Sequence, residues 1–113
     1  MRERIKATKD DWEISEMPAK QEKFSIKRRF SKEKMEHLSF GHIPCEMEDK
    51  WFFYMEDNQM FIHRSWSGAC IYILTFRKHG MIDVIVNRDP NQYTCSDIQE
   101  DVDELNNLLD IWC

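Results

Sequence analysis

Glycine and proline are scarce in this 113-residue sequence, which has three residues of each. A chain with so few turn-forming residues is neither a linker nor a low-complexity segment. Long apolar runs are also missing, because the longest, Ala69 to Leu74, is much shorter than the roughly 20 residues of a membrane-spanning helix. The opening stretch Met-Arg-Glu-Arg-Ile-Lys has no apolar run like that of a secretory signal. We therefore expect a cytoplasmic protein with no membrane association.

An excess of basic charge is absent as well. Lys and Arg number 16 against 21 Asp and Glu, which gives a formal net charge of −5. Broad binding of nucleic acid requires a surplus of cations, so bulk nucleic-acid binding is not expected, although a local basic patch is compatible with this charge. The four cysteines include no C-x-x-C pair, and without a secretory signal we expect reduced thiols.

No metal-ligand set is complete in the sequence. The densest group of ligand-type residues is His37, His42 and Cys45. A structural zinc site takes four closely organised ligands, and no fourth lies nearby. We therefore expect neither a metal nor a cofactor.

A catalytic set does not emerge either. His63 lies close to Ser65, but no G-x-S-x-G motif accompanies the pair. Three acids, Glu56, Asp57 and Asp83, have the residue type needed for acid–base chemistry. Hairpin turns and strand edges commonly carry such acids for solubility. The sequence thus favours a protein without catalysis and leaves the question of a reaction open.

The pattern of apolar residues predicts an α+β fold. Segments of β-branched and aromatic or alternating character predict strands at residues 24–30, 51–56, 60–65, 69–77 and 81–88. Short connections join the last four segments, which indicates an antiparallel meander. The first segment can pair at either edge of the meander or lie outside it.

Two helices are expected. Ser31 is placed to cap a short helix through about Phe40, and Gly41 to end it. Ser96 and Gln99 form a capping-box pair at the start of a second helix, which runs to about Trp112 and covers the sheet. Its apolar stripe consists of Ile98, Val102, Leu105, Leu109 and Trp112. Its acids are predicted to lie outside that stripe; they are Glu100, Asp101, Asp103, Glu104 and Asp110.

The chain length is that of one domain with a single core. We interpret residues 1–22 as a charged N-terminal arm and residues 23–113 as one α+β domain. The residues predicted to form the core are Trp51, Phe53, Ile71, Ile85, Val102, Leu105 and Leu109.

Polar chemistry is concentrated in HRSWSG, residues 63–68, where the second strand of the meander gives way to the third. Arg64 suits a bidentate clamp for phosphate, and Trp66 suits a stacking surface for a planar group. Further hydrogen bonds would come from Ser65, Ser67 and the Gly68 amide, with His63 either lining the site or bracing the turn. A purely structural interpretation is also open, in which the arginine is a surface cation and the serines and glycine form a turn.

A second basic stretch, Lys27 to Phe30, places three cations beside an aromatic ring. These are the ingredients of a phosphate groove. The solvated face of a strand produces the same pattern, and the acidic composition favours that interpretation.

The segment from Lys50 to Leu74, KWFFYMEDNQMFIHRSWSGACIYIL, resembles a bacterial domain family. In that family an aromatic strand leads into an HRSW(S/T)G turn and a second aromatic strand. Such segments occur alone and beside ADP-ribose-processing domains such as ADP-ribosylglycohydrolases. The sequence has none of a glycohydrolase's own catalytic helices or acidic metal-binding motifs, so the resemblance implies at most an accessory role and supplies no catalytic residue.

Two functions follow as hypotheses. The first is recognition of a phosphate-bearing, nucleotide-like or ADP-ribose-like ligand at the 63–68 turn, without catalysis. The alternative is a protein-interaction module, of adaptor or immunity type, whose acidic surface meets a basic partner.

Overall fold

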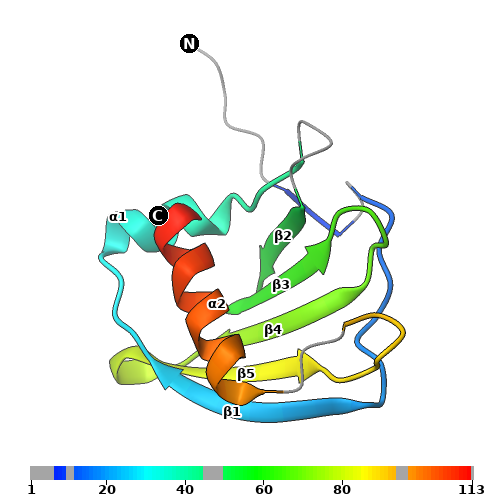
Figure 1. Ribbon diagram of the computed structural model, residues 1–113. Helices are drawn as coiled ribbons and strands as arrows, with labels where there is room; N and C mark the ends of the chain where they lie inside the picture. Colours follow the sequence, from blue (N-terminus) through cyan, green and yellow to red (C-terminus); the bar gives the residue numbers. More distant parts are fainter. Residues whose placement is uncertain (1–6, 10–11, 45–49, 94–96, 113) are drawn as a thin grey trace.

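The computed structural model describes residues 7–9, 12–44, 50–93 and 97–112, and Figure 1 shows their arrangement. An antiparallel sheet has the strand order β1-β5-β4-β3-β2. Its strands are β1 (Gln21–Lys27), β2 (Trp51–Glu56), β3 (Gln59–Arg64), β4 (Cys70–Phe76) and β5 (Met81–Asn87). The helices are α1 (Lys32–Ser39), the short 3₁₀ helix η1 (Lys78–Gly80) and α2 (Ile98–Trp112), which crosses one face of the sheet. The predicted α+β fold is confirmed.

The sheet is a meander from β2 to β5, and β1 joins it at the edge beside β5. This pairing answers the question that the sequence left open. β1 begins earlier than the predicted strand 24–30, at Gln21, and its last paired residue is Lys27. Gln21 and Glu22 therefore belong to the sheet, although the sequence pattern had assigned them to the arm.

The main core lies between the sheet and α2. Alternate strand residues face the helix, and the buried set includes Trp51, Phe53, Met60, Ile62, Ile71, Tyr72, Leu74, Ile82, Val84, Val86, Leu105, Leu108 and Leu109. Val102 packs against this core and is partly buried. The prediction for Ile85 was wrong, because the alternation of β5 directs Ile82 and Val84 toward α2 and leaves Ile85 only partly buried on the opposite face.

The opposite face of the sheet is covered along β2 by residues from the N-terminal part of the chain. Phe52 and Tyr54 are buried there with Ala7, and Trp12 and Ile14 pack against them. The indole of Trp12 stacks on the Phe52 ring with a centroid separation of 6.0 Å. The sheet is therefore packed on both sides at its β2 edge.

Both α-helices, α1 and α2, have a side-chain cap at the start. Ser31 accepts a hydrogen bond from the Lys34 amide at the start of α1, as predicted. Ser96 of the predicted capping box lies outside the described residues. Asp97, the residue before α2, accepts from the Gln99 amide at 2.9 Å.

Asp101 corrects the prediction that every acid of α2 lies outside its apolar stripe. Its side chain is fully buried and accepts hydrogen bonds from Arg88, Tyr93 and Tyr72. Arg88 also forms an ion pair with Glu22 of β1. The carboxylate is tolerated in the core because these donors replace its water.

Truncating Leu105 to Ala should lower the free energy of unfolding by about 2–5 kcal/mol, because the fully buried side chain leaves a cavity under α2. Chemical denaturation measures this loss. Ile111→Ala on the same helix is the control, since that side chain is 67% exposed and should cost less than about 0.5 kcal/mol. A loss below about 1 kcal/mol in the Leu105 variant would mean that α2 does not seal the core.

Replacing Asp101 with Ala should cost about 3 kcal/mol, because Arg88 and the tyrosine hydroxyls lose a buried acceptor. Urea denaturation compares this variant with Asp103→Ala, which removes an exposed acid of the same helix. Equal stabilities of the two variants would contradict the role assigned to the buried carboxylate.

Candidate functional site

The 63–68 turn is held by backbone hydrogen bonds at its base. The Gly68 amide donates to the Arg64 carbonyl at 2.8 Å, and the Arg64 amide donates to the Ala69 carbonyl at 2.9 Å. Gly68 has a φ of +74°, and a Cβ at this position would lie 2.3 Å from the Glu13 carbonyl oxygen. Only glycine fits this backbone. The predicted role of the Gly68 amide as a ligand donor is therefore corrected, since that group is bonded inside the turn.

His63 braces the turn from the face of the sheet opposite α2. Its side chain is buried, with 2% exposure, and its ring stacks on that of Tyr54 at 5.9 Å. Nδ1 lies 3.0 Å from the Gly68 carbonyl oxygen, which can only accept, so Nδ1 carries the proton. Nε2 is buried and has no hydrogen-bond partner among the residues that the structure describes. Burial lowers the pKa of His63 below its ordinary value, and the ring is neutral.

A segment far away in the sequence, residues 12–15, completes the surroundings of the turn. Trp12 Nε1 donates to the Ser65 carbonyl at 2.8 Å, and the Ser15 amide donates to the Gly68 carbonyl at 2.9 Å. We call residues 12–15 the N-terminal strap. The sequence does not predict the strap, because isolated apolar residues such as Trp12 and Ile14 in a charged stretch do not show where they pack.

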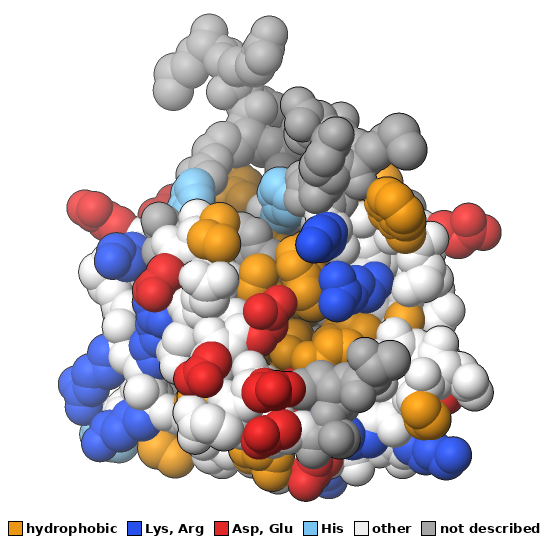
Figure 2. All heavy atoms as spheres, viewed as in Figure 1, with side chains coloured by type: hydrophobic (Ala, Val, Ile, Leu, Met, Phe, Trp, Pro, Cys, Tyr) orange, Lys and Arg blue, Asp and Glu red, His pale blue; other side chains and the backbone are white. Residues whose placement is uncertain are grey.

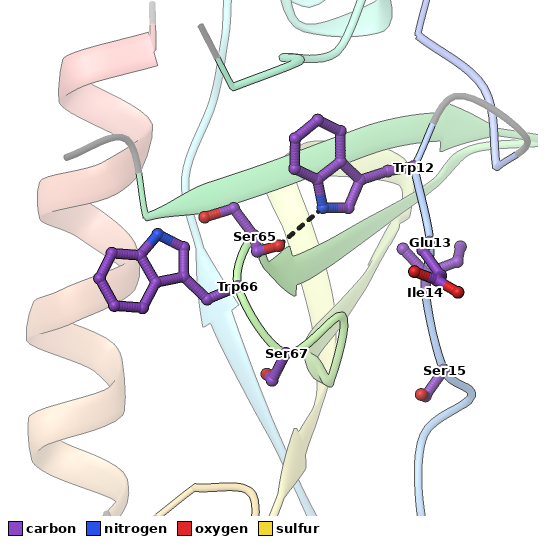
Figure 3. Close-up of a pocket in the computed structure, with 7 residues that line it drawn as sticks. All are labelled: Trp12, Glu13, Ile14, Ser15, Ser65, Trp66 and Ser67. Atoms are coloured by element: carbon purple, nitrogen blue, oxygen red, sulfur yellow. Dashed lines mark hydrogen bonds between the residues drawn. The ribbon is translucent and has the colours of Figure 1, made fainter. Parts of the chain in front are cut away.

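An open pocket of about 580 Å³ lies between the strap and the turn (Figure 3). Its lining residues are Trp12, Glu13, Ile14, Ser15, Ser65, Trp66 and Ser67. Trp12 and Trp66 lie on opposite sides of the turn in Figure 3. Trp66 is 77% exposed, an unusual state for so large an apolar ring.

Arg64 lies on the other face of the sheet from His63. Its guanidinium carbon is 4.5 Å from the centre of the Trp51 ring, a cation–π contact that holds the side chain in place. Among the residues that the structure describes, no carboxylate forms an ion pair with Arg64. The backbone carbonyl of Lys50 accepts a hydrogen bond from the Ser65 amide at 2.9 Å. Lys50, which is exposed, is therefore a second basic residue at this end of the sheet.

The structure thus divides the predicted site residues into three groups. Ser65, Trp66 and Ser67 line the pocket, Arg64 lies on the α2 side of the sheet, and His63 and Gly68 shape the turn. The serines differ in exposure, because Ser65 is buried while Ser67 is exposed and accepts from the Ala69 amide at 3.3 Å.

Other residues considered for chemistry are placed elsewhere. Within the described ranges, no group of three or more His, Cys, Asp or Glu side chains is arranged to hold a metal ion, and Cys45 lies outside those ranges. Asp83 accepts from Arg77 and Ser25, and these hydrogen bonds lower the pKa of its carboxyl group. Glu56 and Asp57 lie at the β2–β3 turn, where Asp57 has a positive φ of 48°. None of the described helices combines the length and the apolar character needed to cross a lipid bilayer.

Comparison of the chain with protein-family models, with curated proteins and with solved structures found no match. The resemblance around HRSWSG is therefore a prediction, and the function has to be argued from the geometry of the turn.

The buried, neutral state of His63 predicts a pH dependence of stability. Because the folded pKa is below the ordinary value of 6.5, the unfolded chain binds the proton first as pH falls. The free energy of unfolding should therefore decrease as pH drops below about 7, by at most about 1.4 kcal/mol per pH unit, and this contribution should level off below the folded pKa. Denaturation at several pH values measures the slope.

The control is His63→Asn, whose side-chain amide can still donate to the Gly68 carbonyl but does not titrate. His37, His42 and His79 remain in both proteins, so the difference between the two slopes isolates His63. Identical slopes in the two proteins would contradict the burial of a neutral imidazole.

Proposed function

We propose that this protein recognises a small phosphate-bearing or nucleotide-like ligand at the 63–68 turn and catalyses no reaction on it. The observation that carries the proposal is Arg64, a half-buried guanidinium held over Trp51 without an ion pair among the described residues. On a chain with a net charge of −5, carboxylates to neutralise it are plentiful. An arginine that is fixed in position and has no carboxylate partner among the described residues is suited to binding an external anion.

The neighbouring aromatic side chain supports a planar ligand. Trp66 follows Arg64 by two residues and exposes most of its ring. Stacking of a nucleobase on such a ring contributes about 1–3 kcal/mol. The turn itself is rigid, since it is held by its own backbone bonds and by His63, so little conformational entropy is lost on binding.

Electrostatics favour one orientation of the ligand. Glu13 lines the strap side of the pocket and repels an anion there. The phosphate therefore belongs on the Arg64 side, and the planar group belongs against Trp66. The exposed Ser67 hydroxyl is available to orient the ligand by hydrogen bonding.

A second candidate function has its own supporting observation. Figure 2 shows acidic side chains in a column where Figure 1 places α2. Glu100, Asp103 and Asp110 are exposed on this helix. The column suits a protein partner with a basic surface, as the interaction-module hypothesis requires.

Arg64→Ala should weaken ligand binding about a hundredfold, because a desolvated charge pair contributes a few kcal/mol. Trp66→Ala should weaken it about tenfold through lost stacking. Thermal-shift screening against ADP-ribose, NAD, mono- and cyclic nucleotides and inorganic phosphate identifies a ligand, and calorimetry then measures its affinity.

The matched controls are Lys23→Ala, which removes an exposed cation of β1, and Ile111→Ala, which removes an exposed apolar side chain of α2. Both should bind like the wild type. If no compound raises the melting temperature of the wild type, or if a compound raises it equally in the Arg64 and Trp66 variants, the turn has only a structural role.

A further inference from the structure

A basic pocket lies at the end of the sheet opposite the 63–68 turn. Its cations come from two segments far apart in the sequence, the end of β1 and the β4–β5 connection that contains η1. The pocket has a volume of about 340 Å³, and its lining includes Arg28, Arg29, Arg77 and His79 together with Phe30 and Phe76. Figure 2 shows Lys and Arg side chains gathered at the lower left, where Figure 1 places η1. We call this site the basic pocket.

Backbone contacts bring the two segments together. The Arg28 amide donates to the Gly80 carbonyl at 2.8 Å, which extends the β1–β5 pairing beyond Lys27. A Cβ on Gly80 would lie 2.6 Å from Arg29 Cγ, so the Arg29 side chain lies directly against this residue. Glycine at position 80 therefore allows the arginine of one segment to lie against the turn of the other.

The turn has a costly backbone conformation. His79 has φ 61° and ψ 29°, the left-handed region that residues other than glycine rarely adopt, and Gly80 follows with φ 78°. Such a conformation persists only where the surroundings enforce it, and it is common at binding sites. The chain reverses here between Arg77 and Met81, whose carbonyl accepts from the Arg77 amide at 2.8 Å, and Arg77 and His79 both line the pocket.

The charges of the pocket are only partly neutralised. Arg28 is held by α2, where it donates to the Asn106 carbonyl at 3.1 Å and forms an ion pair with Asp110. Arg77 forms an ion pair with Asp83 at 2.6 Å, and the side chains are 61% and 45% exposed. Arg29 is exposed and has no ion pair among the described residues. A local positive charge therefore exists on an acidic molecule.

Aromatic rings provide the apolar part of the site. Phe30 and Phe76 pack edge to face, with centroids 6.3 Å apart, and both are partly buried. The Arg28 guanidinium carbon lies 5.1 Å from the centre of the Phe30 ring. Guanidinium groups beside aromatic rings are the combination that recognises a phosphate together with an attached planar or apolar group.

We propose that the basic pocket is a second anion site, which binds the phosphate group of an ester through Arg29, Arg77 and His79. Arg28 is a positioning residue that fixes the pocket against α2. The phosphate is carried either by a free small molecule or by a short stretch of single-stranded nucleic acid, since the same forked donors recognise both. This site shares no lining residue with the pocket at the 63–68 turn.

The test uses the ¹⁵N-labelled full chain, titrated at low salt with pyrophosphate and, separately, with a short single-stranded oligonucleotide. Backbone amide shifts should change at residues 77–82 in at least one titration. Arg29→Ala/Arg77→Ala should weaken binding at least about tenfold, because charge-assisted hydrogen bonds are lost. The surface pair Arg77–Asp83 contributes little to stability, so this variant should remain folded, which its amide spectrum verifies directly.

Two controls separate a built site from general charge attraction. Lys20→Ala/Lys23→Ala removes the same charge from exposed positions outside the pocket and should change the affinity less than about twofold. Arg29→Lys/Arg77→Lys keeps the charge but loses the forked geometry, and its affinity should lie between those of the wild type and the alanine variant.

Two results would overturn the proposal: no shift change at residues 77–82 with either compound, or equal loss of affinity in the two alanine double variants. The two titrations also identify the source of the phosphate. Tighter binding of the oligonucleotide, with the steeper salt dependence, supports nucleic acid, whereas equal or weaker binding supports a free phosphate ester. Nucleotide binding at Arg64 should be unchanged in all these variants, so the experiment tests the two proposed sites independently.

Discussion

The carbonyl oxygen of Gly68 is the junction on which the candidate site depends. It accepts one hydrogen bond from His63 Nδ1 and one from the Ser15 amide. These bonds join the end of β3 and the 63–68 turn to the N-terminal strap, which is distant in sequence. A side chain at position 68 would push the Glu13 carbonyl away and separate the strap from the turn. The pocket at the turn exists because this position has no Cβ.

The same junction explains why neighbouring residues have such different environments. The strap and the aromatic side chains of β2 cover one face of the sheet, so His63 is buried there. Arg64, one residue later, points to the α2 face and lies over Trp51. A neutral imidazole suits the buried position of His63, where a charge would be costly, and a guanidinium suits the half-buried position of Arg64. The alternation of a strand thus separates the residue that holds the turn from the residue that we propose binds an anion.

The architecture was largely predictable, because it depends on local patterns. Alternating aromatic and β-branched residues identified β2 to β5, and the apolar stripe with Leu105 and Leu109 identified α2. The place of β1 was not predictable, since its seven-residue pairing with β5 is a long-range contact. Asp101 was misplaced for a similar reason. Its partners Arg88, Tyr72 and Tyr93 come from other parts of the chain. No local sequence pattern shows that hydrogen-bond donors surround this carboxylate in the core.

The candidate site was predictable in part. HRSWSG identified the turn from its residue types, but the strap, which supplies Trp12 and Ser15, leaves no signal near residue 63. For Arg28 and Arg29 of the Lys27–Phe30 stretch, the acidic composition of the molecule favours the solvated face of a strand. Net charge is a sum over the surface, however, and a ligand meets only the charges within about a Debye length, roughly 10 Å. Asp110 of α2 pairs with Arg28 at the edge of the basic pocket, whereas Arg29 is exposed and has no ion pair among the described residues, so a local positive charge is compatible with an acidic molecule.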